Sequence, residues 1–255
     1  MSTGTLYLVP TPLDHGCDSQ APLPDVLPLG TLRIAAGLTH WISENARSTR
    51  AFLKRVDAEL PLAQPIQAQQ VTELPRAVHK KGDHASGFDA RPLLAPALQG
   101  HDLGLVSEAG MPAVADPGSS VVRAAHALGI PVVPLVGPVS ILLALAASGL
   151  NGQSFAFVGY LPQDAAARTA RIRELEALAL RTRQTQLFIE TPYRNQALLQ
   201  ALAHTLAPTT WLAVGAGLTL PDARIVGMRV SDWRRRLADE PPQARALPAI
   251  HAIGP

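Results

Sequence analysis

The chain is poor in cysteine, lysine and aromatic residues, and these scarcities narrow the classes of protein it can belong to. Its single cysteine, Cys17, cannot form a disulfide within the chain and predicts a reducing, cytoplasmic location. Aromatic residues are 4% of the 255, and none forms a platform beside the arginine-rich segments, which disfavours stacking of single-stranded nucleic acid. Only three of the 22 basic residues are lysine, and the formal net charge is +2.

Motifs for phosphate, metal and export are also missing. No Gly-x-Gly-x-x-Gly or Gly-Lys-Ser/Thr sequence occurs, which disfavours a nicotinamide-dependent dehydrogenase. His79 and His84 have no clustered third ligand, so we expect no metal. The N-terminus lacks a basic, apolar signal, so we expect no signal peptide. Residues 130–150 carry no charge over a length that could span a bilayer, but their three prolines instead predict a strand, a loop and a buried helix.

The remaining composition and pattern indicate a folded α/β protein. Hydrophobic residues make up 47% and charged residues 16% of the chain. Short apolar strands alternate with helical segments, which predicts a mainly parallel sheet. A polar, turn-rich segment at 148–153 predicts a boundary between two α/β domains, 1–150 and 151–255. Residues 60–90 have no clear periodicity and predict no element, and Ser231 is expected to cap a helix.

One loop stands out, SEAGMPAVADPG at residues 107–118. Gly110 and Gly118 allow a close approach of backbone to a ligand, and the two prolines stiffen the loop. Glu108 and Asp116 could accept hydrogen bonds from hydroxyl or ammonium groups. Such a loop could equally be a turn that only connects two elements. Three other loops follow predicted strands, and in parallel sheets such loops meet at one edge, which favours a pocket for a small, partly cationic ligand.

Several segments resemble, in the same order, the tetrapyrrole (corrin/porphyrin) methylase superfamily, and within it the members that methylate a ribose 2′-hydroxyl of small-subunit ribosomal RNA. They are TLYLVPTPL, WISENARSTRAFLKRV, the stretch from DLGLVSEAGMPAVADPG to LVGPVS, FVGYLPQD and LFIETPYR. The resemblance implies an S-adenosylmethionine-dependent methyltransferase. It also implies two α/β domains with the cofactor in the cleft between them, and a homodimer.

The resemblance also implies site residues. Two prolines would lie beneath the cofactor, Pro10 and Pro12. Six residues would line its methionine and ribose side: Ala109, Gly110, Met111, Val114, Val139 and Ser140. Five residues of the second domain would hold the adenine end: Ile189, Glu190, Thr191, Gly217 and Leu218. Glu44 and Arg47 are candidates for catalysis, with an ordinary ion pair at the strand end as the alternative.

The chain departs from the RNA-methylating members at three places. Those members usually carry Glu-Asp-Thr-Arg at 44–47, where this chain has Asn45 in place of the aspartate. They usually carry Ser-Asp-Ala-Gly-Thr-Pro at 107–112, where this chain has Met111 in place of the threonine. They usually carry Glu-Leu-Thr-Lys at 217–220, where this chain has Leu220 in place of the lysine. The acceptor therefore stays open between a ribosomal RNA ribose and a tetrapyrrole-like small molecule. The alternative is a catalytically inactive S-adenosylmethionine-binding protein.

Two arginine-rich segments bear on that choice. Residues 168–183 and 233–237 could attract RNA phosphates, but such a run is more often a solvated helix face. Together with the net charge of +2, they slightly favour a chain without specific RNA affinity.

Overall fold

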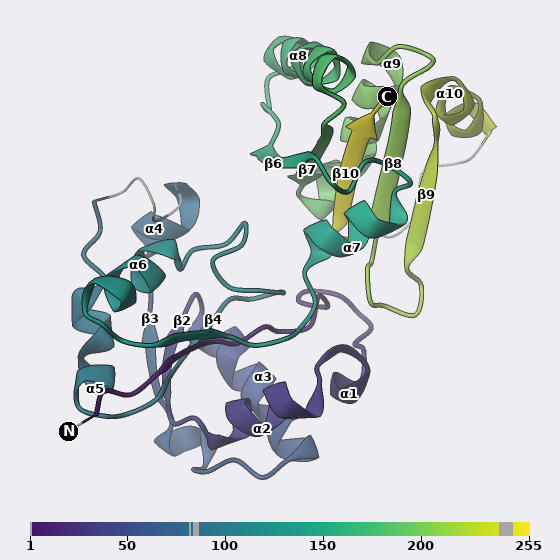
Figure 1. Ribbon diagram of the computed structural model, residues 1–255. Coiled ribbons are helices and arrows are strands. Elements are labelled where there is room, and N and C mark those ends of the chain that lie inside the picture. Colours follow the sequence, from purple (N-terminus) through teal and green to yellow (C-terminus); the bar gives the residue numbers. More distant parts are fainter. Residues whose placement is uncertain (1, 82, 84–86, 240–246) are drawn as a thin grey trace. The chain divides into compact units, whose positions relative to one another are not determined.

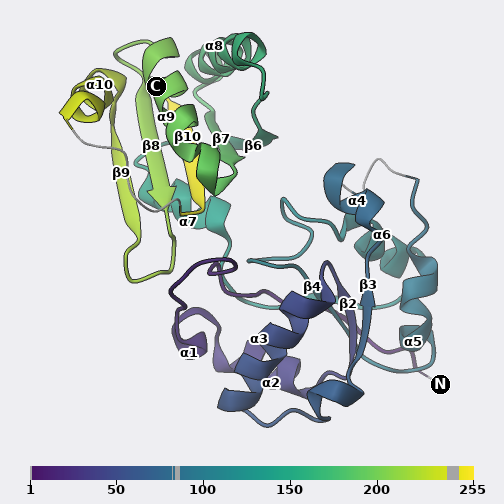
Figure 2. The ribbon, with the colours of Figure 1, turned by 180° about the vertical axis from the view of Figure 1, so that it is seen from behind.

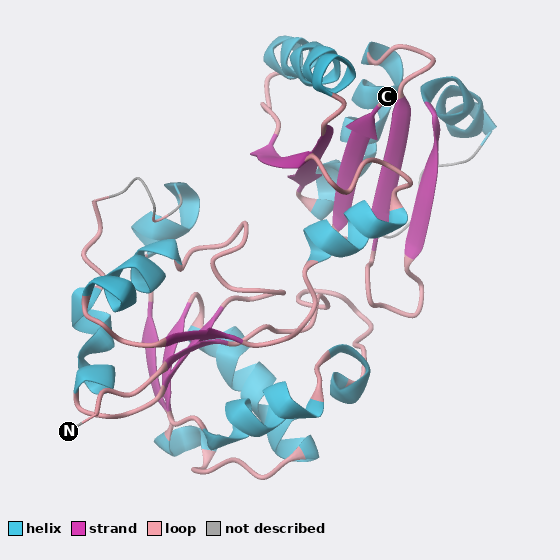
Figure 3. Cartoon of the chain, in the orientation of Figure 1, coloured by secondary structure: helices cyan, strands magenta, loops and turns pink. Residues whose placement is uncertain are grey.

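The chain folds into two compact units, Met1–Val139 and Ser140–Pro255, each built on one five-stranded sheet (Figures 1 and 3). The computed structural model describes residues 2–81, 83, 87–239 and 247–255. The predicted α/β class is confirmed. The division falls before the boundary expected at residue 150, because α7 (Ser140–Ala147) packs against strands of the second unit.

The first sheet is parallel throughout, in the order β3-β2-β4-β1-β5. Its strands are β1 (Leu6–Leu8), β2 (His40–Ser43), β3 (Gln70–Glu73), β4 (Leu103–Val106) and β5 (Val132–Pro134). Leu6 of β1 is in register with Leu103 on one side and Val132 on the other. All five strands therefore end at the same edge of the sheet, where ligands of parallel sheets bind.

Helices cover both faces of this sheet (Figure 2). One face carries α1 (Leu23–Val26), α2 (Leu29–Gly37) and α3 (Ala46–Glu59), and the other carries α4 (Arg76–Lys81), the 3-10 turn η2 (Arg91–Leu94), α5 (Ala95–Leu98) and α6 (Ser119–Ala127). Successive strand residues point to opposite faces. Trp41 accordingly packs in the first core with Phe52, and Ile42 packs in the second with Leu94.

Residues 60–90, which predicted no element, contribute the edge of this sheet. They contain the 3-10 turn η1 (Ile66–Ala68), β3 and α4. Three of the four residues of β3 are exposed, so the strand lacks the alternation that marks a half-buried strand. Among the strands of the described residues, it pairs with β2 alone.

The second sheet is mixed, in the order β6-β7-β10-β8-β9. Its strands are β6 (Phe155–Tyr160), β7 (Thr185–Glu190), β8 (Trp211–Ala216), β9 (Arg224–Arg229) and β10 (Ala249–Gly254). Among the described strands of this unit, β6 and β7 alone pair in parallel. The mainly parallel sheet predicted for the segments before residue 148 is the sheet of the first unit. The last strand, β10, inserts antiparallel between β7 and β8, which makes those two strands parallel to each other.

The second unit packs its sheet against α7, α8 (Ala165–Thr182), α9 (Asn195–Thr205) and α10 (Val230–Asp239), with the 3-10 turn η3 (Pro192–Arg194) before α9. Ser231 does not cap α10, because the helix begins at Val230, directly after β9. The uncharged residues 130–150 form a strand, a loop and a helix as predicted, namely β5, the loop after it and α7. The helix is only partly buried, because Leu142 and Leu143 are 49% and 40% exposed. Within the described residues, no helix is long and apolar enough to cross a membrane.

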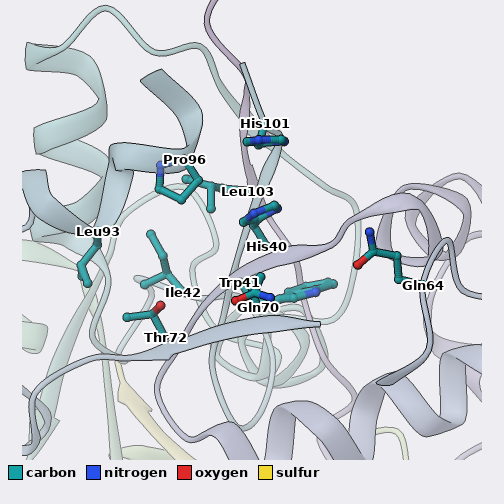
Figure 4. A pocket seen from close by; sticks show the side chains of 10 residues that line it. All are labelled: His40, Trp41, Ile42, Gln64, Gln70, Thr72, Leu93, Pro96, His101 and Leu103. Atoms are coloured by element: carbon teal, nitrogen blue, oxygen red, sulfur yellow. The ribbon is translucent and has the colours of Figure 1, made fainter. Parts of the chain in front are cut away.

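A cavity of about 410 Å³ opens at the amino ends of β2, β3 and β4 (Figure 4). His40 and His101 stack beside it, with ring centroids 4.6 Å apart. Burial and the neighbouring His101 lower the pKa of His40. The cavity lies at the opposite end of the strands from the loops that the sequence singled out, so it takes no part in the site described below.

Asp83 fastens the end of the 107–118 loop to α6. Its carboxylate accepts hydrogen bonds from the Gly118 and Ser120 N–H groups at 2.9 and 2.7 Å, and from the Ser119 and Ser120 hydroxyls at 2.7 and 2.6 Å. Burial raises the pKa of Asp83, but these hydrogen bonds outweigh it and lower the pKa to about 2. The ionised form is therefore favoured in the folded chain.

We predict that Asp83→Ala lowers the free energy of unfolding by roughly 1 to 3 kcal/mol at pH 7, because four donors lose their acceptor. A carboxylate with a lowered folded pKa stabilises the fold above its unfolded pKa of 3.8, and this contribution disappears as the pH falls towards about 2. The free energies of unfolding of Asp83→Ala and of the unmodified chain, measured by urea titration, should therefore become equal in acid. Asp89→Ala, at an exposed carboxylate, is the control. Equal stability of Asp83→Ala and the unmodified chain at pH 7 would contradict this role.

Candidate functional site

Four loops of the first unit meet at the carboxyl ends of its strands, as the sequence predicted. Thr11, after β1, exchanges two backbone hydrogen bonds of 3.0 Å with Gly110, after β4. A Cβ added at Gly137, after β5, would lie 2.3 Å from Cγ of Pro10, so those loops also touch. After β2, Asn45 donates its amide to Glu108 at 2.9 Å.

The 107–118 loop is held in a strained, backbone-lined shape. Gly110 and Gly118 have φ of 77° and 137°, and Ala113 and Ala115 also lie at positive φ, 64° and 65°. The left-handed region costs a residue with a Cβ about 1 to 2 kcal/mol, so the rest of the unit must hold these alanines there. A Cβ at Gly110 would lie 3.1 Å from Leu13 and 3.4 Å from the Pro138 carbonyl oxygen, which leaves room only for backbone.

A buried ion pair fixes the loop after β1. Arg55 of α3 donates from both terminal nitrogens to the two carboxylate oxygens of Asp14, at 3.0 and 3.1 Å. The same guanidinium donates to the Ala21 carbonyl oxygen at 2.6 Å, and the Ala21 N–H donates to Asp14 at 3.1 Å. No local pattern indicates this pair, because its members lie 41 residues apart in the sequence.

Three carboxyl groups gather beside the strained loop: Glu44 after β2, and Glu108 and Asp116 on either side of the loop. The Glu108 N–H donates to Glu44 at 3.2 Å. Asn45 also accepts from the Arg47 N–H, so one side chain both caps α3 and donates to Glu108. An aspartate at position 45 could cap the helix but could not donate to Glu108, which gives a physical reason for the departure from Glu-Asp-Thr-Arg.

Crowding of these carboxyl groups perturbs Asp116. Burial, followed by repulsion from Glu44, raises the pKa of Asp116 to about 7, and Glu108 adds to the rise. The nearby Ser107 hydroxyl works in the opposite direction. Asp116 is therefore poised to gain or lose a proton near neutral pH.

The two predicted catalytic residues have different surroundings. Glu44 is half-buried within the carboxyl cluster, whereas Arg47 is exposed in the first turn of α3. Within the part of the chain that the structure describes, the Arg47 guanidinium forms no ion pair. The role of Arg47 stays a prediction.

The remaining predicted cofactor residues of the first unit line the same edge. Pro10 and Pro12 are buried, and Ala109, Met111 and Val139 are half-buried. Val114 is 42% exposed at the tip of the loop. Ser140 begins α7 and belongs to the second unit. A ligand on this edge would meet backbone, small side chains and the carboxyl cluster.

The second unit brings its predicted residues to one edge of its own sheet. Ala249 of β10 is in register with both Glu190 and Ala216, so Ile189, Glu190 and Thr191 lie near the segment Gly217–Leu218. The buried Glu190 accepts from the Thr191 N–H at 2.7 Å and from Arg194 at 2.8 and 3.0 Å. This carboxylate is thus occupied within its own unit.

Thr219, next to Leu218, has an unusual conformation. Its φ is 71°, which a β-branched residue rarely adopts, and its buried hydroxyl has no hydrogen-bond partner among the described residues. The Gly217 N–H donates to the Pro248 carbonyl oxygen at 2.9 Å, and a Cβ at Gly217 would lie 2.8 Å from Leu247. Strain and an unsatisfied hydroxyl together are typical of a ligand-binding loop.

The arginine-rich helix α8 partly uses its charges within the unit. Arg168 donates to the Gln163 carbonyl oxygen at 3.0 Å, and Arg171 pairs with Glu174 at 2.7 Å. Arg173 and Arg181 are exposed. Of the histidine pair considered for metal, His84 lies outside the described residues; no cluster of three or more metal-ligating side chains occurs in the described part of the chain.

Comparison with known proteins indicates the family. The family model of the tetrapyrrole (corrin/porphyrin) methylases matches residues 29–233. The "Ribosomal RNA small subunit methyltransferase I" of Micromonospora olivasterospora is 32% identical over 93% of this chain and 67% of the relative. Proteins of the same name from Pseudomonas aeruginosa and Xylella fastidiosa are 34% and 36% identical, over 80% of this chain and 61% and 64% of their own lengths.

A solved structure shares the fold. The uroporphyrin-III-C-methyltransferase from Thermus thermophilus aligns with a TM-score of 0.52 at 20% identity, over 98% of this chain and 94% of that one. The two-unit α/β architecture is therefore that of a known fold.

We predict that Asp116→Asn stabilises the chain above pH 7. Since the folded pKa of about 7 exceeds the unfolded value of 3.8, ionisation of Asp116 costs stability progressively between about pH 4 and pH 7. The neutral amide removes that cost, so the thermal midpoint at pH 8 should rise by about 2 to 4 °C for each kcal/mol relieved. The two midpoints should approach each other near pH 4. A thermal midpoint at pH 8 that is lower for Asp116→Asn than for the unmodified chain would contradict the repulsion between these carboxyl groups.

Proposed function

The chain belongs to the tetrapyrrole (corrin/porphyrin) methylase family of methyltransferases, and we propose that it transfers a methyl group from S-adenosylmethionine to a ribose hydroxyl of ribosomal RNA. The observation that carries the proposal is the meeting of four loops at one edge of the first sheet, with the carboxyl group of Asp116 poised near neutral pH beside them. Methyl transfer to a hydroxyl needs alignment of the reactants and removal of one proton.

The residues at this edge fit S-adenosylmethionine. Gly110 leaves little room for a side chain in a loop held at positive φ, which favours a close approach of ligand to backbone. Glu44, Glu108 and Asp116 complement a cationic ligand. When bound, the donor supplies an activated methyl group on a positively charged sulfur. Ala109, Gly110, Met111 and Val114 would contact its methionine and ribose groups, as would Val139 and Ser140, with Pro10 and Pro12 beneath.

The second unit would serve the adenine end. Gly217 and Leu218 allow a ligand to approach the backbone closely. The neighbouring Thr219 hydroxyl has no hydrogen-bond partner among the described residues, so it is available to a ligand. Glu190 holds Thr191 and Arg194 in place, so we assign it to positioning this edge rather than to direct charge recognition.

Ribosomal RNA is the acceptor that the relatives favour, because three of them at 32 to 36% identity carry that substrate in their names. The slight lean against RNA from net charge and from positions 45, 111 and 220 weighs less, since Asn45 makes a compensating contact with Glu108. A tetrapyrrole-like acceptor is the second candidate, from the family alone. The third, an inactive S-adenosylmethionine-binding protein, would have no use for the crowding at Asp116, which costs stability.

We propose a homodimer acting in the cytoplasm, where ribosomal RNA is found. Unit 1 leaves Val133 and Val136 of its edge segment 37% and 70% exposed, apolar surface that a partner could cover. Sedimentation equilibrium at micromolar concentration should give twice the mass of the chain. A monomer under those conditions would contradict the dimer.

We predict that Gly110→Val weakens S-adenosylmethionine binding at least tenfold, about 1.4 kcal/mol. The branched side chain meets Leu13 and the Pro138 carbonyl and disfavours the positive φ of the loop. Calorimetric titration measures the affinity. Gly110→Ala provides a milder change should valine prevent folding, and Gly30→Val, in open space on α2, is the matched control. Undiminished affinity in a folded Gly110→Val protein would remove the loop from the site.

The acceptor is tested by transfer of a labelled methyl group. We predict that label enters a ribose of ribosomal RNA when small subunits are offered, and that a panel of tetrapyrroles remains unlabelled. Binding to the RNA should weaken steeply with salt, because each phosphate contact releases counterions. Label in a tetrapyrrole alone would replace the acceptor while keeping the family. Binding of S-adenosylmethionine without transfer to either acceptor would favour the inactive protein.

A further inference from the structure

Transfer of a methyl group to a hydroxyl oxygen leaves a proton that must be removed, and nothing so far assigns its acceptor. We propose that Asp116 is the catalytic residue that takes this proton, while Glu44 and Glu108 act through Asp116 as positioning residues. This inference rests on the proposed function.

The hydrogen-bond partners of the three carboxyl groups distinguish them. Glu44 accepts from the Glu108 N–H at 3.2 Å. Glu108 accepts from Asn45 at 2.9 Å, and its other oxygen lies 3.6 Å from Nε2 of His15. In the described residues, Asp116 has neither an amide donor nor a cation beside it, only the Ser107 hydroxyl. Of the three carboxyl groups, Asp116 is thus the one that a proton or a further hydrogen-bond donor would stabilise most.

Ser107 gives an independent sign of a ligand. The residue is 5% exposed, and its hydroxyl forms no bond at hydrogen-bonding geometry with any described residue, although it lies close enough to Asp116 to lower the pKa of that carboxyl. Buried polar side chains nearly always have a partner. An acceptor hydroxyl at this place would complete the hydrogen bonding of both Ser107 and Asp116.

The surrounding charges set when Asp116 can take a proton. Glu44 faces it from the end of β2 and Glu108 from the end of β4; His15, after β1, contacts Glu108, and Asp83 holds the far end of the loop at Gly118. With both glutamates ionised, the pKa of Asp116 stands at about 7. A cationic ligand beside the cluster would lower this pKa, so that Asp116 loses its proton before the reaction.

The charges then balance through the step. The acceptor oxygen forms a bond to the methyl carbon and gives its proton to the Asp116 carboxylate. The bond between methyl carbon and sulfur breaks, its electron pair stays on sulfur, and the positive charge of the donor disappears. Since the cluster gains a proton as the adjacent cation is lost, the local charge is the same before and after transfer.

The first test measures protons rather than turnover. Calorimetric titrations at pH 7 in buffers of different ionisation enthalpy should show that S-adenosylmethionine binding releases up to about half a proton, because a group with a pKa near the pH is half protonated. The product S-adenosylhomocysteine, which lacks the positive charge on sulfur, should release almost none. Asp116→Asn should abolish the difference, whereas Asp89→Asn, at an exposed carboxylate, should keep it. Equal proton release for both ligands, or a difference that survives in Asp116→Asn, overturns the proposal.

The second test separates binding from chemistry. At saturating S-adenosylmethionine, Asp116→Asn should lower kcat by at least a hundredfold, the effect of losing a general base. It should also weaken S-adenosylmethionine binding, because a cation that lowers the pKa of Asp116 binds the ionised form more tightly than the neutral one. In the unmodified chain, kcat/KM for S-adenosylmethionine, which reports the free enzyme, should rise with pH to a plateau above about pH 7. Asn45→Asp retains a helix-capping oxygen and adds a negative charge beside Glu108, so its rise should occur at higher pH.

The outcomes distinguish this inference from the proposed function. If the unmodified chain binds no S-adenosylmethionine, the proposed function fails and the inference with it. If the chain binds and transfers methyl groups while a folded Asp116→Asn protein keeps kcat within tenfold, only the assignment of Asp116 is wrong. The thermal midpoint of the variant shows whether it is folded.

Discussion

The parallel pairing of β2, β4, β1 and β5 is the constraint on which the rest of the site depends. Because these strands run in one direction, every loop that follows them emerges at the same edge. That geometry places Glu44 and Glu108, 64 residues apart, within reach of one backbone hydrogen bond. It also stacks the loop of Pro10 against Gly110 and Gly137, so a backbone-lined surface and a group of carboxyl groups arise together.

The same edge carries features that oppose folding, and buried interactions elsewhere in the unit offset them. Alanines at positive φ and the crowded Asp116 each cost stability. The carboxylates of Asp83 and Asp14 each accept several hydrogen bonds, including two at Asp14 from Arg55. Asp83 holds the end of the 107–118 loop, and Asp14 holds the loop after β1. A chain selected for stability alone would not keep an aspartic acid beside two other carboxyl groups, which is why the crowding indicates chemistry.

The sequence predicted the fold class, the convergence of the loops and most elements, because these depend on local periodicity and on turn residues. It did not predict β3, whose exposed residues show no alternation, or the antiparallel insertion of β10, which depends on pairing between distant segments. Ser231 looked like a cap, but α10 starts directly at the end of β9. The ion pair of Asp14 with Arg55 and the contact of Asn45 with Glu108 were also missed, since side chains remote in sequence meet only in the folded unit. The contact of Asn45 with Glu108 gives a physical reason for the departure at position 45.

The titration of Asp116 followed by carboxyl carbon NMR tests the account most directly, because it reports the crowded group itself. The account predicts a midpoint near pH 7 in the chain alone and a clear fall towards the ordinary value of 3.8 when S-adenosylmethionine is added. A midpoint near 4 in both states would contradict it, because the carboxyl groups would then not interact and the cluster would have no means of sensing the donor.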